Sequence, residues 1–241
     1  MPFSRKFSKK TVKKTYRKKS VKASVKGRKS LVALIKKVAL KPCETKNTHI
    51  IAENQQLYHN VPYLSYGGLN TTTGITEDDT GTATVNCRVG DEIILRGLSY
   101  KFWFANKLDR PNVMYKIIFY KYQSGYTPSG SDPFFAQGSS NYMIRDLNTE
   151  KYKVIKTVNF NLQTSAQKLI SQDVFAGAEA HRKVSVWIPL KNQKCKYENG
   201  SSVPRFIDYA FTVVCYDSYG TLITDNIASF AVNRKLYFKD P

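Results

Sequence analysis

The basic side chains of the first 41 residues are the groups in this chain whose type and spacing point most clearly to a chemistry. This segment holds 16 of the 38 Lys and Arg residues and no Asp or Glu, whereas the remaining 200 residues carry 22 basic residues against all 18 acidic ones. Most of the formal net charge of +20 therefore lies in residues 1–41. Side chains of this kind bind polyanions, because neutralising phosphates releases condensed counterions whatever the nucleotide sequence. We predict a nucleic-acid-binding arm over residues 1–41 and one folded domain over residues 42–241.

The predicted phosphate-binding residues are the lysines and arginines along this arm. They are Arg5, Lys6, Lys9, Lys10, Lys13, Lys14, Arg17, Lys18, Lys19, Lys22, Lys26, Arg28, Lys29, Lys36 and Lys37. A denser cluster within them also fits a nuclear localisation signal, a use compatible with nucleic-acid binding. That cluster comprises Lys9, Lys10, Lys13, Lys14, Arg17, Lys18 and Lys19. The alternative, a solvated or membrane-surface tail, is disfavoured because basic charge this dense usually has an anionic partner.

No set of residues in the sequence has the spacing of a catalytic or metal site. His49, His59 and His181 are too far apart to form a metal pair on one element, so each is expected to be a surface or a hydrogen-bonded histidine. The run "SGYTPSGS" at 124–131 lacks the GK[ST] ending of a phosphate loop. The acidic run at 77–79 lies in a Thr- and Gly-rich stretch typical of a solvated loop. We predict no enzyme, no metal and no cofactor.

The cysteines and the apolar runs indicate the cellular compartment in which the protein is expected. Cys43, Cys87, Cys195 and Cys215 are widely separated and form no CxxC pair, which is typical of reduced thiols in an intracellular protein. Lysines interrupt every apolar stretch of the arm, so it is not expected to be a secretory signal. No run approaches the roughly 18 apolar residues of a membrane helix, and we predict no membrane insertion.

Two kinds of element must position these residues, and the first is a short helix in the arm. We expect residues 1–29 to be extended and mostly disordered in isolation, because their charges repel one another. Within "SLVALIKKVALK" at 30–41, the apolar residues Leu31, Leu34, Ile35 and Val38 follow the spacing of one helical face. Pro42 stops this helix, which we place at about 31–40. A helix this short is marginal alone in water, so its apolar face predicts a partner.

The second kind of element is the β-strand, which the period-2 pattern predicts throughout the rest of the chain. The runs 98–104, 113–122, 152–162, 184–190, 206–216 and 228–238 alternate apolar and polar residues, and 49–55 is a weaker candidate. In 98–104, for example, Leu98, Tyr100 and Phe102 share one face. In 152–162, the predicted apolar face carries Tyr152, Val154, Val158, Phe160 and Leu162. Long strands with uneven connections predict an all-β sandwich or jelly roll of about eight strands.

Two tryptophans fall on the polar side of predicted strands. Trp103 alternates with the apolar face of 98–104, and Trp187 alternates with the apolar face of 184–190. Both could stack on a nucleic-acid base. Packing within the sheet or at a subunit contact is the interpretation we favour from the sequence.

Several segments resemble the coat proteins of geminiviruses and related small circular single-stranded DNA viruses. The stretches are "IRDLNTEKYKVIKTVNFNL" at 144–162, "KCKYENGSS" at 194–202 and "NRKLYFKD" at 233–240, with a basic arm of similar style. The zinc-type cysteine and histidine arrangement of geminivirus coats is absent, so no zinc role is carried over. The arm has only Arg5, Arg17 and Arg28 as arginines before residue 42, which places the chain closer to the genomovirus-like or circovirus-like groups.

The resemblance implies a structural protein with an eight-stranded jelly roll and an internal basic arm. It implies a small T=1-like shell of about sixty copies that packages single-stranded DNA, with the virion and the host nucleus as locations and nuclear import receptors as partners. Phosphate neutralisation does not distinguish the sugars, so an RNA cargo, as in small satellite RNA viruses, stays an alternative. A monomeric nucleic-acid-binding protein with a basic tail is a second alternative.

Overall fold

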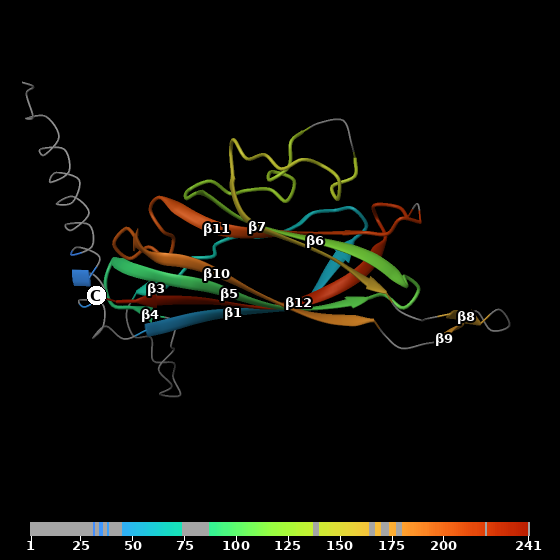
Figure 1. The fold of residues 1–241 in the computed structure, drawn as a ribbon, viewed down its shortest axis with the longest axis horizontal. Coiled ribbons are helices and arrows are strands. Elements are labelled where there is room, and N and C mark those ends of the chain that lie inside the picture. Colours follow the sequence, from blue (N-terminus) through green and yellow to red (C-terminus); the bar gives the residue numbers. More distant parts are fainter. Residues whose placement is uncertain are drawn as a thin grey trace, which may run out of the picture. The chain divides into compact units, whose positions relative to one another are not determined.

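The computed structural model of the chain divides into two units, residues 1–44 and 45–241, and each is described by itself. The structure describes residues 31, 34, 35, 38, 45–73, 87–136, 140–163, 167–169, 174–176, 180–219 and 221–240. The second unit is all-β and forms two antiparallel four-stranded sheets that face each other (Figure 1). The predicted all-β sandwich is therefore confirmed.

The first sheet contains the long strands that begin and end the second unit. Its order is β1 (Thr45–Tyr58), β12 (Asn226–Lys239), β5 (Glu92–Asn106) and β10 (His181–Lys196). The edge strands β1 and β10 each carry an irregularity, between Ala52 and Gln55 and between Pro189 and Gln193. Bulges and an edge proline interrupt the row of free backbone groups along which another strand could pair.

The second sheet places a short edge strand beside three longer ones. Its order is β2 (Tyr63–Ser65), β11 (Ile207–Tyr216), β6 (Asn112–Gln123) and β7 (Lys153–Gln163). Two small pairs lie outside the sandwich: β3 (Thr72–Thr73) with β4 (Cys87–Arg88), and β8 (Gln167–Leu169) with β9 (Val174–Ala176). The β8–β9 pair belongs to the connection between β7 and β10. The alternation in the sequence predicts every long strand but not β2 or the small pairs, because a strand of two or three residues is too short to show a period.

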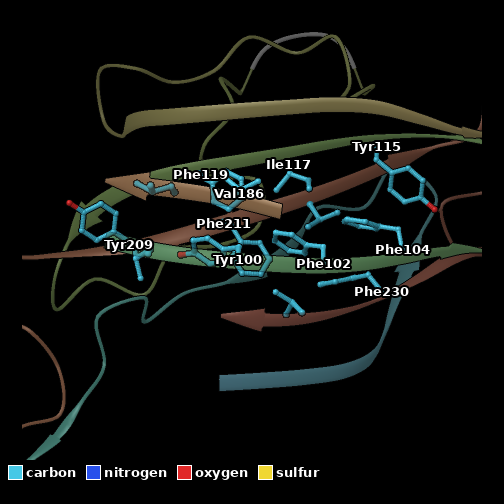
Figure 2. Close-up of a cluster of buried hydrophobic side chains, with 14 of the residues drawn as sticks. Tyr100, Phe102, Phe104, Tyr115, Ile117, Phe119, Val186, Tyr209, Phe211 and Phe230 are labelled. Carbon is cyan, nitrogen blue, oxygen red and sulfur yellow. The ribbon is translucent and has the colours of Figure 1, made fainter. Parts of the chain in front are cut away.

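The core fills the space between the two sheets, and its largest members are aromatic (Figure 2). On β5, Tyr100, Phe102 and Phe104 are at most 2% exposed, as the alternation in 98–104 predicts. The Phe102 ring meets Phe211 of the opposite sheet edge-on, with centroids 5.2 Å apart. Aromatic pairs in this geometry add to the stabilisation from burial alone, so the rows of rings hold the two sheets face to face.

A second apolar cluster lies on the outer face of the β2-β11-β6-β7 sheet. Ile118, Tyr120 and Tyr122 of β6 pack there with Phe134, Tyr152, Ala210 and Val214, and with partly buried side chains of the 124–152 connection. Figure 1 shows this connection, of which 137–139 lie outside the described residues, passing over that sheet. Strands β6 and β11 are consequently buried on both faces.

One predicted face is corrected by the structure. Val158, Phe160 and Leu162 of β7 pack into the core between the sheets, whereas Tyr152 and Val154 belong to the outer cluster. The register between β6 and β7 shifts between Phe119 and Tyr120, so that Phe119 pairs with Lys156 but Tyr120 pairs with Val154. One additional residue on β7 therefore moves the later part of the alternation to the opposite side of the sheet.

Candidate nucleic-acid interface

The phosphate-binding residues predicted in the arm, from Arg5 to Lys37, lie outside the described residues, as does the nuclear-localisation cluster. The apolar face predicted for the arm helix is described: Leu31, Leu34, Ile35 and Val38 are helical and between 56% and 60% exposed. The remaining residues of the predicted helix 31–40 lie outside the described ones. In the single chain, this apolar face therefore presents hydrophobic surface to solvent.

A second candidate surface is the outer face of the β1-β12-β5-β10 sheet, which carries both tryptophans of the chain. Trp103 of β5 is 54% exposed and Trp187 of β10 is 49% exposed. We name this surface the Trp–Lys face after Trp103, Trp187, Lys101, Lys183 and Lys235. About half of each indole is thus covered by its own sheet, and a subunit contact at the exposed half stays a prediction.

The strand register brings these five side chains to one side of the sheet. Trp103 lies directly opposite Lys183, and Ser99 lies opposite both Trp187 and Lys235. Residues two apart along a strand point to the same side, which adds Lys101 between Ser99 and Trp103. The core residues Tyr100, Phe102 and Phe104 occupy the alternate positions of β5 and point the other way. The Trp–Lys face is therefore continuous across β12, β5 and β10.

Gly97 creates the space in which the Trp187 indole lies. A Cβ atom at position 97 would collide with Cζ2 and Cη2 of Trp187. The indole therefore covers the backbone of β5 instead of standing clear of the sheet. Its other neighbour is Tyr237 of β12, with ring centroids 5.6 Å apart and an interplanar angle of 62°. These contacts orient Trp187 while about half of it stays exposed.

A groove of about 550 Å³ lies beside Trp103 on this face. Lys101, Lys183, Ser185 and Asn233 line it together with the edge residues Ile51 and Glu53. The ion pairs of Lys46 with Asp240 and of Glu92 with Lys194 and Lys196 involve none of the residues that line the groove. The groove thus combines ammonium groups, an amide, a hydroxyl and an exposed aromatic ring.

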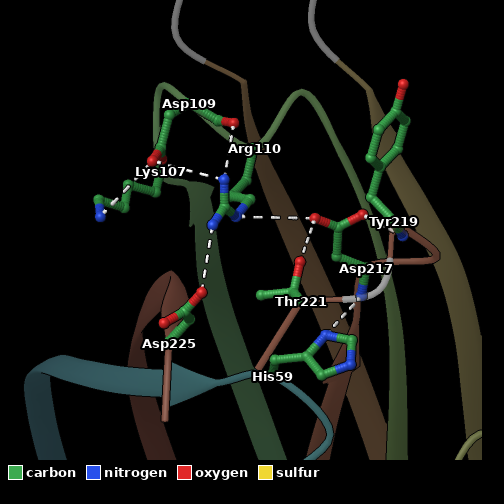
Figure 3. A network of polar contacts seen from close by, with 8 residues as sticks. All are labelled: His59, Lys107, Asp109, Arg110, Asp217, Tyr219, Thr221 and Asp225. Atoms are coloured by element: carbon green, nitrogen blue, oxygen red, sulfur yellow. Dashed lines mark hydrogen bonds and ion pairs between the residues drawn. The ribbon is translucent and has the colours of Figure 1, made fainter. Parts of the chain in front are cut away.

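A polar network at one end of the sandwich joins the β1–β2, β5–β6 and β11–β12 connections (Figure 3). Arg110, which follows β5, forms an ion pair from Nε to Oδ2 of Asp217 at 3.7 Å and from Nη2 to Oδ2 of Asp225 at 3.4 Å. The Thr221 hydroxyl donates to Asp217 Oδ2 at 3.1 Å. These connections run between the two sheets, so the network ties the sheets together where the aromatic core ends.

His59 takes part in this network as a neutral acceptor. Its Nδ1 accepts the backbone N–H of Asp217 at 3.2 Å, and its ring lies 4.6 Å from the ring of Tyr216. Burial lowers the pKa of His59 below its usual 6.5; the carboxylates of Asp217 and Asp225 oppose this shift, and Arg110 adds to it. The expectation of a hydrogen-bonded histidine is confirmed at this position.

The other side chains that could take part in a reaction are the cysteines and the acidic residues. Among the residues that the structure describes, no three His, Cys, Asp or Glu side chains come together as metal ligands. Cys87, Cys195 and Cys215 are buried, and burial raises the pKa of Cys195 to about 11, which makes it a poor nucleophile. Cys43 and the acidic run 77–79 lie outside the described residues.

No protein-family model matches the chain, and no curated protein sequence matches it. Within the described part of the chain, no helix has the length and apolar character needed to cross a bilayer.

The sequence pattern placed nucleic-acid binding in the arm and gave base stacking on Trp103 and Trp187 only as the less favoured alternative to packing. The available signal was the polar side of two strands, where Trp103 follows Lys101 by two positions and Trp187 follows Lys183 by four. That signal could not be used from the sequence alone, because it does not show that β5 and β10 are hydrogen-bonded neighbours.

Proposed function

We propose that this chain is a structural capsid protein that assembles into a small icosahedral, T=1-like shell of about sixty copies and packages single-stranded DNA with its basic arm. The arm and its clustered lysines also act, in this proposal, as a nuclear localisation signal read by import receptors. The protein then resides in the virion and, during assembly, in the host nucleus.

The strand order is the observation that supports this proposal most. Numbered one to eight along the chain, the strands of the sandwich lie in the orders 1-8-3-6 and 2-7-4-5. The antiparallel pairs β1–β12, β2–β11, β5–β10 and β6–β7 are nested, as in one long hairpin that has rolled up. Nesting of this kind is what the double Greek key of a jelly roll requires, and jelly rolls occur in viral capsids. We propose that the sandwich is an eight-stranded jelly roll of this kind.

The charge partition supplies the second argument. The segment before β1 carries 16 basic and no acidic residues up to residue 41, while the rest of the chain is close to neutral. A nearly neutral body can pack against copies of itself without strong repulsion, and a cationic arm can neutralise a packaged polyanion. The exposed apolar face of Leu31, Leu34, Ile35 and Val38 provides each copy with hydrophobic surface to bury on assembly.

The test is assembly of the purified full chain with and without single-stranded DNA, over a range of salt, followed by sedimentation and electron microscopy. We expect closed particles of uniform size that protect nucleic acid from nuclease. A chain that stays monomeric under every condition would contradict the proposal. Digestion of the extracted cargo with DNase or RNase identifies the nucleic acid.

Matched charge variants test the role of the arm. Replacing Lys9, Lys10, Lys13 and Lys14 with serine removes four phosphate contacts, so protected nucleic acid and the salt slope of binding should both fall, the slope by about 0.7 for each contact. The control replaces Lys121, Lys151, Lys153 and Lys156 of the folded domain with serine, which lowers the net charge by the same amount. Equal packaging by both variants would refute the assigned role of the arm.

A second candidate function is a monomeric module that binds single-stranded nucleic acid. The exposure of Trp103 and Trp187 on an open sheet favours it, because such proteins stack bases on exposed aromatic rings. This candidate predicts tight binding with no large particle, so the same sedimentation experiment separates the two.

A further inference from the structure

The Trp–Lys face exposes more aromatic surface than the folded domain needs for its own packing. Trp103 and Trp187 each leave about half of their surface exposed, and no segment of the described chain covers that half. Isolated exposed hydrophobic residues are ordinary, but two indoles and Tyr237 on one sheet form an extended aromatic surface. Polar side chains lie among these rings.

The polar side chains among the rings are mostly cationic or hydrogen-bonding. Lys183 is the cross-strand neighbour of Trp103, and Lys235 lies across β5 from Trp187. Lys101 lies between the two tryptophans along the strand, opposite Asn233 and Ser185. Glu53, at the edge, is the acidic residue that lines the groove. The face is therefore positively charged where its rings are exposed.

The spacing of the rings suits a chain molecule better than a small ligand. Trp187 lies over Gly97, six residues from Trp103 along β5, and an antiparallel strand rises about 3.4 Å per residue. Gly97 and Trp103 are thus separated by about 20 Å along the strand, with Lys101 between them. A ligand that uses both rings must be extended, carry flat groups at intervals and bear negative charge between those groups.

We propose that the Trp–Lys face binds single-stranded nucleic acid, with bases stacked on Trp103 and Trp187 and phosphates neutralised by Lys101, Lys183 and Lys235. Stacking does not depend on base identity, since every base has a flat face, so this binding is expected to tolerate any sequence. Ser185 and Asn233 supply further hydrogen bonds to phosphate or base edges. The inference rests on the proposed function for the kind of partner, and it adds a second binding surface, on the folded domain.

The experiment uses the tryptophans themselves as reporters in the full chain. The chain has two tryptophans and both lie on this face, whereas the arm has none. Titration with an oligothymidylate should quench tryptophan emission as bases stack on the indoles. Inorganic polyphosphate, which has charge but no bases, should occupy the arm and leave the emission nearly unchanged. These two ligands separate binding by the face from binding by the arm.

Matched variants assign the quenching to the face. Lys101→Glu with Lys183→Glu should weaken the quenching phase about tenfold or more, while Lys121→Glu with Lys153→Glu, on the other sheet, makes the same change in net charge and should weaken it much less. Trp103→Phe and Trp187→Phe should each remove part of the signal. The wild-type titration needs no variant, so a variant that fails to fold does not decide the result.

The remaining outcomes of the titration distinguish this inference from the proposed function. Oligothymidylate that binds without quenching overturns this inference and leaves the function of the arm intact. No binding of any oligonucleotide overturns both proposals. Emission that shifts with protein concentration in the absence of nucleic acid, and is then insensitive to oligothymidylate, shows that the face is a contact between copies of the chain and overturns the inference.

Discussion

The two outer faces of the sandwich both carry aromatic side chains but differ in what covers them. Over the β2-β11-β6-β7 sheet, the chain's own 124–152 connection buries Tyr120, Phe134 and Tyr152. Over the β1-β12-β5-β10 sheet, Trp103 and Trp187 stay about half exposed. The covered face stabilises the folded domain, whereas the open face contributes little to stability and is available to a partner.

The strand sequences account for this difference. β6 and β11 carry apolar residues on both sides, as in "KIIFY" and "AFTVVCY", so both faces must be buried. β5 and β10 alternate, and their outward positions hold lysine, serine and tryptophan. A face that mixes ammonium groups with rings could not be covered by an apolar loop without burying unpaired charge. The comparison therefore predicts that substitutions on the two faces have different consequences.

The largest expected effect follows from truncating one aromatic side chain on each face. Phe134→Ala removes a ring that is 4% exposed and packed against Tyr142 at 4.9 Å, and should cost about 3–5 kcal/mol of unfolding free energy. Trp103→Ala removes a larger ring but should cost only about 1 kcal/mol, because about half of the indole is already exposed to solvent. Urea denaturation of the unassembled chain measures both. Equal losses would contradict the division into a covered and an open face.

An intermediate effect is expected at the lysine that fastens the covering connection. The Lys116 ammonium donates to the carbonyl of Met143 at 3.1 Å and to those of Tyr142 and Arg145 at 3.4 Å. Burial lowers the pKa of Lys116, and Asp146 opposes that shift. Lys116→Met keeps an unbranched side chain of nearly the same length but leaves the carbonyls without this donor, which should cost about 1–3 kcal/mol.

Amide hydrogen exchange shows which part of the chain loses stability in this variant. In Lys116→Met, the amides of 140–147 should exchange faster than in the wild type, while those of β5 and β12 should change little. Lys121→Met, on the same strand, is the control and should leave both regions protected. If the connection stays as protected as before, Lys116 does not fasten it.

The smallest effect is expected from the polar network around His59, at the end of the sandwich where the aromatic core stops. The lowered pKa of His59 means that the unfolded chain takes up this proton more readily than the folded one. Stability is therefore fully present above about pH 6.5 and declines as the pH falls below it. Thermal unfolding at about pH 7.5 and about pH 5.5 should show a lower midpoint at the acidic pH.

A pair of histidine variants isolates this contribution. His59→Gln keeps an acceptor near the Asp217 N–H but cannot titrate, so the difference between the two midpoints should shrink. His181→Gln alters an exposed histidine beside Trp103 and should leave the difference as it is in the wild type. A wild-type pH dependence in His59→Gln would assign the effect to other groups.

Local pattern predicted much of the fold and only part of the candidate site. The alternation in 98–104 identified the buried face of β5, because a strand places every second residue on one side whatever its partner. The same rule failed in 152–162, where the shift opposite Phe119 and Tyr120 separates Val154 from Val158. The position of a bulge depends on how the neighbouring strand and the covering connection pack, and no period reports it.

The sequence by itself determined the β class, the long strands and the separation of a cationic arm from a nearly neutral body, since composition and short-range periodicity carry this information. The tertiary structure decided which polar side stays open. Trp103 and Lys183 are far apart in the sequence, and only the pairing of β5 with β10 makes them neighbours. Likewise, the space for Trp187 exists because Gly97 lies beneath it on another strand. Contacts between strands distant in the sequence depend on the whole packed chain, so they become visible only in the folded molecule.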